Sequence, residues 1–92
     1  MLEYNIYFSH NGNNEYKKIL KRMNKHLNNF TILNGLGYYN GSSELSKCLR
    51  VVDLENDKEL ILKLLNICDY IKRIAKQECV LFTKREIYAE LI

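Results

Sequence analysis

The chain has 92 residues, a length that corresponds to one domain with a thin stability margin. Hydrophobic residues make up 47% of it, which excludes a disordered chain, and no stretch approaches the roughly 18 apolar residues that a membrane span needs. The net charge is +3, and the positive excess lies almost wholly in one segment, residues 14–28.

The first predicted elements are a strand and an amphipathic helix. Residues 2–9 alternate between apolar and polar positions, with aromatic and β-branched side chains, which is typical of a strand. The run HNGNN ends this strand, and Asn13 or Asn14 is expected to cap the following helix. Residues 14–28 predict that helix, because apolar side chains recur along one face: Tyr16, Ile19, Leu20, Met23 and Leu27.

A β-hairpin is predicted next. Residues 30–40 favour a strand whose glycines permit a bulge or strong twist, and residues 47–55 favour its antiparallel partner. Between them, residues 40–45 begin with Asn-Gly, the strongest short signal for a hairpin turn.

The second half of the chain predicts a longer helix and one or two strands. Asn56 is expected to begin the helix, with Glu59 completing a capping box, and an apolar stripe then continues to Ala75. Residues 79–83 favour a fourth strand. The tail, residues 84–92, alternates again, which favours a short fifth strand over a helical turn.

The resulting order, βαββαβ, predicts a single α+β domain spanning residues 1–92. This is the ferredoxin-like sandwich, with both helices on one face of a four-stranded antiparallel sheet. The strands place apolar side chains on both faces, for example Leu49 and Val51 on one and Cys48 and Val52 on the other. Because something must cover the second face, we expect a homodimer; a monomer with an exposed apolar face is the alternative.

The basic side chains of the first helix are candidate partner contacts. They can meet an acidic protein surface or nucleic-acid phosphates, although a solvated helix face gives the same pattern. These residues are Lys17, Lys18, Lys21, Arg22 and Lys25. Tyr38 and Tyr39, near the predicted hairpin tip, are the other candidate contacts, and hairpin stabilisation is the alternative for them.

A second candidate site is the loop after the first strand. His10 can act as a base and Asn11 belongs to a Gly/Asn run that can offer N–H groups to an anion, so a ligand near His10, Asn11 and Tyr39 at a dimer interface is the alternative hypothesis. An RNA-recognition module shares the element order, but its stacking aromatics are missing from the predicted third strand.

Cysteine usage and the N-terminus predict a cytoplasmic protein without a metal site or cofactor. Cys48, Cys68 and Cys79 are odd in number and contain no CxxC pair, so they are expected to be small core residues in a reducing compartment. The first residues have neither the basic region nor the apolar core of a signal peptide.

The segment from Gly35 to Gly41, the long second helix, Gln77–Leu81 and the ending Glu86–Ile92 resemble short uncharacterised proteins of phages and other mobile elements. This resemblance assigns no catalytic residue and implies a context in which compact proteins bind and block a host enzyme or defence complex. The leading hypothesis is therefore a non-enzymatic binding protein, such as an inhibitor of a CRISPR-like or nucleic-acid-processing complex. A ligand- or nucleotide-binding regulatory domain and a dimeric α+β barrel enzyme remain as alternatives.

Overall fold

The structure, a computed structural model, describes residues 1–92 apart from the side chain of Tyr39. It confirms the predicted βαββαβ order and the sheet, whose strand order is β2-β3-β1-β4 with every neighbouring pair antiparallel. The elements are β1 (Leu2–Phe8), α1 (Gly12–His26), β2 (Thr31–Tyr39), β3 (Ser42–Asp53), α2 (Leu60–Ile74) and β4 (Leu81–Glu86).

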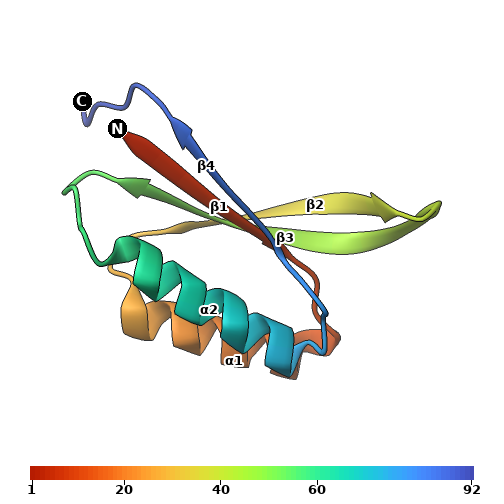
Figure 1. The fold of residues 1–92 in the computed structure, drawn as a ribbon. Helices are drawn as coiled ribbons and strands as arrows, with labels where there is room; N and C mark the ends of the chain where they lie inside the picture. Colours follow the sequence, from red (N-terminus) through yellow and green to blue (C-terminus); the bar gives the residue numbers. More distant parts are fainter.

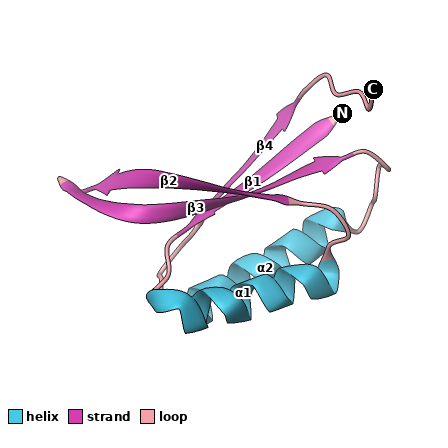
Figure 2. Ribbon diagram, turned by 180° about the vertical axis from the view of Figure 1, so that it is seen from behind, coloured by secondary structure: helices cyan, strands magenta, loops and turns pink.

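Both helices cover the same face of the sheet, as Figures 1 and 2 show from opposite sides. The core lies between these two layers. Burying apolar side chains here is the main stabilising contribution, about 25 cal/mol for each Å² removed from water. The side chains with almost no exposure come from the sheet and from both helices: Ile6, Ile19, Met23, Leu49, Leu64, Ile67 and Ile71.

The hairpin of β2 and β3 extends past the ends of the helices as an uncovered arm (Figure 1). Its turn is only two residues long, because Asn40 and Gly41 both have positive φ angles, 51° and 80°. This conformation is that of a type I′ turn, which Asn-Gly favours. The predicted turn over residues 40–45 was therefore too long, since β3 already begins at Ser42.

The predicted helix caps were wrong. Helix α1 starts at Gly12, before Asn13 and Asn14, and the backbone N–H of Asn11 donates to the Glu15 carboxylate at 2.7 Å. Helix α2 starts at Leu60 instead of Asn56, whose φ angle of 53° lies outside the helical region. The Asp57 carboxylate accepts the N–H of Glu59 at 2.9 Å. A turn that begins at Asp57, one residue after Asn56, therefore takes the place of the predicted capping box.

The last strand runs two to three residues later than predicted, from Leu81 to Glu86. It consumes the first part of the alternating tail, so residues 87–92 contain no helix or strand and the predicted fifth strand is absent from the chain as described. The N–H of Ile87 donates to the carbonyl of Met1 at 2.7 Å, which continues the pairing of β1 and β4 by one bond. The two termini consequently lie together (Figure 1).

The outer face of the sheet, away from the helices, is apolar only in part. The predicted alternation is correct, with Leu49 and Val51 in the core and Cys48 and Val52 on the other side. The middle of the outer face, however, carries Glu3 and Asn5, which are 5% and 3% exposed. The expectation of two largely apolar faces therefore fails at the centre, because charged and amide side chains cover one another there.

Candidate functional site

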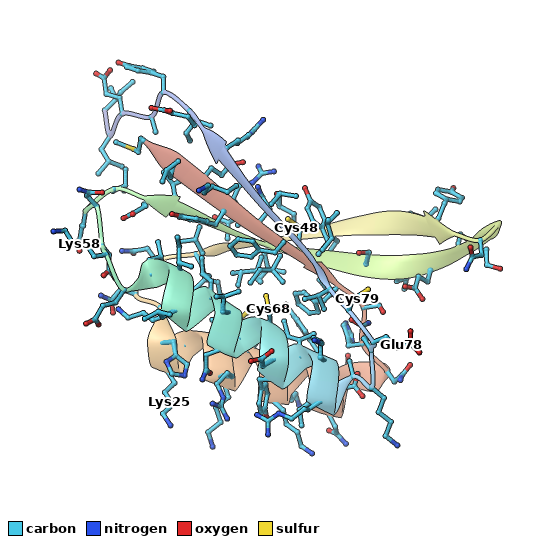
Figure 3. All side chains as sticks on the ribbon, in the orientation of Figure 1. Lys25, Cys48, Lys58, Cys68, Glu78 and Cys79 are labelled. Atoms are coloured by element: carbon cyan, nitrogen blue, oxygen red, sulfur yellow. The ribbon has the colours of Figure 1, made fainter. Side chains whose placement is uncertain are left out.

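A groove of about 560 Å³ on the outside of the helix layer collects most of the predicted basic cluster. Lys18, Lys21, Arg22 and Lys25 line it from α1, and Tyr70 and Ile74 line it from α2. In Figure 3 the side chain of Lys25 points away from the sheet, into solvent. No acidic side chain is among the residues that the structure describes as lining this groove. We call it the helix groove.

Arg22 is held in place within the helix groove. Its guanidinium lies over the ring of Tyr70, 4.3 Å from the centroid, and its Nη1 donates to the Asn66 side-chain oxygen at 3.4 Å. The guanidinium of Arg73 lies 5.8 Å from the same ring centroid. Cation–π contacts of this kind contribute about 0.5–1 kcal/mol at exposed sites. They fix the orientation of one cation, while the neighbouring lysines remain solvent-exposed.

Sequence reasoning found the cations of α1 but missed what lies opposite them. Tyr70 lines the groove from α2, and Arg73 of the same helix lies near the Tyr70 ring; only the packing of the two helices places them beside the cations of α1. Asn66, Tyr70 and Arg73 are spaced three to four residues apart, as residues on one face of a helix are, and this spacing was the signal available in the sequence. Lys17, by contrast, is exposed but is not a lining residue of the helix groove.

His10 belongs to a small stacked cluster at the base of the arm. Its ring lies 4.8 Å from that of Tyr16, and the Lys47 ammonium lies 4.7 Å from the centre of the Tyr16 ring. The Nδ1 of His10 is 3.0 Å from the carbonyl of Gly12. Because a carbonyl only accepts, Nδ1 is the protonated nitrogen in this arrangement. Through this contact His10 packs on the turn that precedes the body of α1.

The structure does not bring His10 and Tyr39 together within one subunit. The pairing of β1 ends at Phe8 and Lys47, next to His10, whereas Tyr39 pairs with Ser42 at the tip of the arm. Five strand residues separate these positions, which corresponds to about 17 Å. The side chain of Tyr39 itself lies outside the described part of the chain. Asn11 is exposed, and its N–H is used by Glu15.

Tyr38 lies near the tip of the arm and is 71% exposed. It is far along the arm from the helix groove, so the predicted partner contacts do not form one continuous surface. Next to it, Leu36 pairs with Leu45 across the hairpin, and these side chains are 53% and 82% exposed. The arm thus carries an uncovered apolar pair on the side that faces the helices further down the sheet.

The outer face of the sheet carries a polar network that was not predicted. The carboxylate Oε1 of Glu3 accepts from Nε of Arg85 at 2.9 Å and from Nδ2 of Asn5 at 3.0 Å, and it lies 3.7 Å from Nε of Arg50. The hydrogen bonds from Asn5 and Arg85 hold the pKa of Glu3 below its ordinary value and outweigh its burial. Only the strand register places these residues side by side: Asn5 is opposite Arg50, and Glu3 is opposite Arg85.

Asn5 connects this network to Cys48. Nε of Arg50 donates to the Asn5 side-chain oxygen at 3.0 Å, and the Cys48 thiol approaches the same oxygen at 3.5 Å. Burial raises the pKa of the Cys48 thiol, which favours the neutral form that donates to Asn5. Cys68 points from α2 toward the sheet (Figure 3), whereas Cys79 is exposed, which corrects the prediction that all the cysteines are core residues.

Among the residues that the structure describes, no three metal-ligating side chains gather in one place. No helix of the described chain has both the length and the hydropathy to cross a bilayer. Charged side chains converge at the helix groove and at the outer-face network.

No protein-family model and no curated protein matches this chain. Solved structures do match it, among them the following two. A de novo designed protein, Foldit4, has a TM-score of 0.55 and 20% identity, covering 95% of this chain and 96% of the designed one. The periplasmic divalent cation tolerance protein CutA from Archaeoglobus fulgidus has a TM-score of 0.50 and 18% identity, covering 99% of this chain and 88% of CutA. Likeness at these identities concerns the fold alone, and the chain has the ferredoxin-like fold.

Proposed function

We propose that this protein is a non-enzymatic binding protein whose helix groove holds an acidic segment of a partner protein. The observation that carries the proposal is the convergence of Lys18, Lys21, Arg22 and Lys25 around Tyr70, with no acidic lining residue among those described. Such a cluster raises the local concentration of anionic partners and speeds their association.

A protein segment fits this groove better than a nucleic acid. Its lining includes the ring of Tyr70 and the aliphatic side chain of Ile74, which offer apolar contact between the cations. An acidic amphipathic helix can use both features, because it presents carboxylates beside an apolar stripe. Nucleic-acid phosphates would use the cations, but the face of Tyr70 on which a base would stack already carries the guanidinium of Arg22.

The test compares two triple charge reversals by fluorescence anisotropy. The probes are a labelled acidic amphipathic peptide and a labelled single-stranded DNA. Reversal of Lys18, Lys21 and Lys25 to Glu should weaken peptide binding about tenfold or more, which is about 1.4 kcal/mol. Arg22 is left in place because it packs on Tyr70.

The matched control reverses Lys17, Lys58 and Lys84, which are exposed lysines outside the groove. It changes the net charge of the protein by the same amount and should retain most of the peptide binding. An equal loss of peptide affinity in both variants would show that only the net charge matters, which would contradict binding in the helix groove. Tighter binding of the DNA than of the peptide would assign the groove to nucleic acid instead.

We propose further that the natural partner belongs to a host defence or nucleic-acid-processing complex, which the protein inhibits in the cytoplasm. The resemblance of the hairpin, the second helix and the last residues to phage and mobile-element proteins supports this context. In cells with CRISPR-type interference against a plasmid, the wild-type protein should preserve the plasmid. The variant with Lys18, Lys21 and Lys25 reversed to Glu should fail to preserve the plasmid. Preservation by both proteins would show that inhibition does not depend on the helix groove.

We also propose that the chain forms a homodimer. The supporting observation is the apolar surface of the arm. Leu36 and Leu45 are exposed there as a pair, beside the edge of β2 that pairs with no other strand of the described chain. Covering an exposed apolar pair and a free strand edge is a common reason for association. Sedimentation at micromolar concentration should show a dimer, and replacing both leucines with Lys should give a monomer. A wild-type monomer would remove this proposal.

A further inference from the structure

A depression of about 270 Å³ lies on the outer face of the sheet, on the side opposite the helices. It exists because strand β2 places Gly35 and Gly37 on that face, where the strand alternation would otherwise put two side chains. Ser46, opposite Gly35, is also small. One row nearer the middle of the sheet, Tyr7, Cys48 and Leu33 lie side by side, and Arg50 follows in the next row.

The two ends of the depression differ in charge. Arg50 lines the end toward the middle of the sheet, whereas Glu44, opposite Gly37, lies toward the tip of the arm. Arg50 is the charged side chain on this face among the lining residues that the structure describes, since the ammonium of Lys47 lies on the helix side over Tyr16, and no carboxylate lines the depression. An anionic group in the depression is therefore favoured at the Arg50 end.

Arg50 is positioned to receive that group. Its contacts with Asn5 and Glu3 both run through Nε, at 3.0 and 3.7 Å. A guanidinium has four more N–H donors on its two Nη atoms, in a planar fork that matches a carboxylate or a phosphate. Because the Nε contact already orients the side chain, less conformational entropy is lost when the fork binds an anion.

We propose that this depression binds a small planar molecule with one anionic group. The ring lies on the glycine backbone of β2 beside Tyr7, and the carboxylate or phosphate is bound by Arg50. The volume of about 270 Å³ is just below the roughly 300 Å³ at which the usual range of ligand sites begins, so the depression suits one ring system and not a dinucleotide. The site is separate from the helix groove and does not depend on the proposed function.

Gly35 offers a variant that fills the depression without disturbing the fold. A Cβ added there meets no atom within 4 Å, and Gly35 is not among the glycines with positive φ. Gly35→Val therefore places a strand-favouring side chain in the depression. Ser43→Val is the matched control, because Ser43 is an exposed residue of the same arm on the opposite face, paired with Tyr38.

The experiment follows amide signals by NMR while indole-3-acetate, indole, AMP and adenosine are added separately. At least one of the two anionic probes should bind and shift the amide signals of Gly35, Gly37 and Ser46. Its uncharged counterpart should bind at least about tenfold more weakly, which is a difference of about 1.4 kcal/mol in binding free energy. Preference for AMP assigns a phosphate ligand, and preference for indole-3-acetate assigns a carboxylate. Gly35→Val should lose this binding and Ser43→Val should keep it. Equal binding by Gly35→Val, equal binding of the uncharged probes, shifts confined to the helices, or no binding of either anion would overturn the proposal.

Discussion

The buried carboxylate of Glu3 is the most informative single group to change. Glu3→Gln keeps the shape of the side chain and an oxygen that accepts from Asn5 and Arg85, but it removes the charge. A hydrogen bond to an ionised group is roughly twice as strong as a neutral one, so the Arg85 contact at 2.9 Å loses about 1 kcal/mol. The Arg50 contact at 3.7 Å adds roughly 0.2–1 kcal/mol, a value for exposed pairs, because the Arg side chains are 37% and 65% exposed.

The free energy of unfolding should therefore fall by about 1–2 kcal/mol at neutral pH, which corresponds to a melting temperature lower by roughly 4–16 °C for a domain of this size. The folded-state pKa of Glu3 is lowered, and an unfolded-chain glutamate titrates near 4.5. The contribution of the charge is thus complete above that value and is lost as the pH falls through the lower, folded-state pKa.

The assay is urea unfolding followed by circular dichroism, for the wild type and Glu3→Gln, at neutral pH and in acid below the folded-state pKa. The stability difference should be largest at neutral pH and should close in acid. Glu44→Gln, at an exposed carboxylate on the arm, is the control and should stay within about 0.5 kcal/mol of the wild type. A variant as stable as the wild type at neutral pH, or a difference that persists unchanged in acid, would refute the role given to the charge.

Two further substitutions and one measurement of thiol reactivity test the fold. Ile67→Ala, at a side chain with no exposure, should lower the free energy of unfolding by about 2–5 kcal/mol in chemical denaturation, and a smaller loss would place α2 away from the core. Gly41→Ala should cost about 1–2 kcal/mol in the same assay because φ is +80° at the turn; a neutral result would contradict the type I′ turn. Cys79 should react quickly with a thiol reagent at neutral pH, whereas Cys48 should react slowly, as should Cys68, whose pKa burial raises to about 11. Three equally fast thiols would contradict the burial of the last two.

The fold class could be predicted because periodicity is strong wherever one face of an element is buried. Residues 2–9 alternate with a period of two, and the α1 stripe from Tyr16 to Leu27 follows the helical period. These patterns depend on burial against the other layer, and the structure has that burial at Ile6, Ile19 and Met23. Asn40-Gly41 predicted the hairpin for a different reason, since both residues tolerate positive φ.

Element boundaries and the outer-face network could not be predicted in the same way. Asn56 and Glu59 have the spacing of a capping box, but Asp57 provides a competing local hydrogen bond that ends the loop later. The network of Glu3 with Arg85 joins residues from opposite ends of the chain. A charged residue such as Glu3 in a strand pattern predicts a solvent-exposed side chain. Only the register of β1 with β4, which places Arg85 opposite Glu3, shows that this carboxylate is covered.

The helix groove and the outer-face depression share one physical feature, which is an arginine held by its neighbours. Arg22 is fixed by Tyr70 and Asn66, and Arg50 is fixed through Nε by Asn5. Lysines add attraction at the helix groove, but each of them loses rotamer entropy when it engages an anion, whereas the fixed guanidinium loses less. Orientation and selectivity should therefore come from the arginines, and long-range attraction from the lysines. This gives the outer-face network a role: a buried carboxylate is costly, but its contact with Arg50 holds a cation at the edge of a depression whose other outer-face side chains carry no charge.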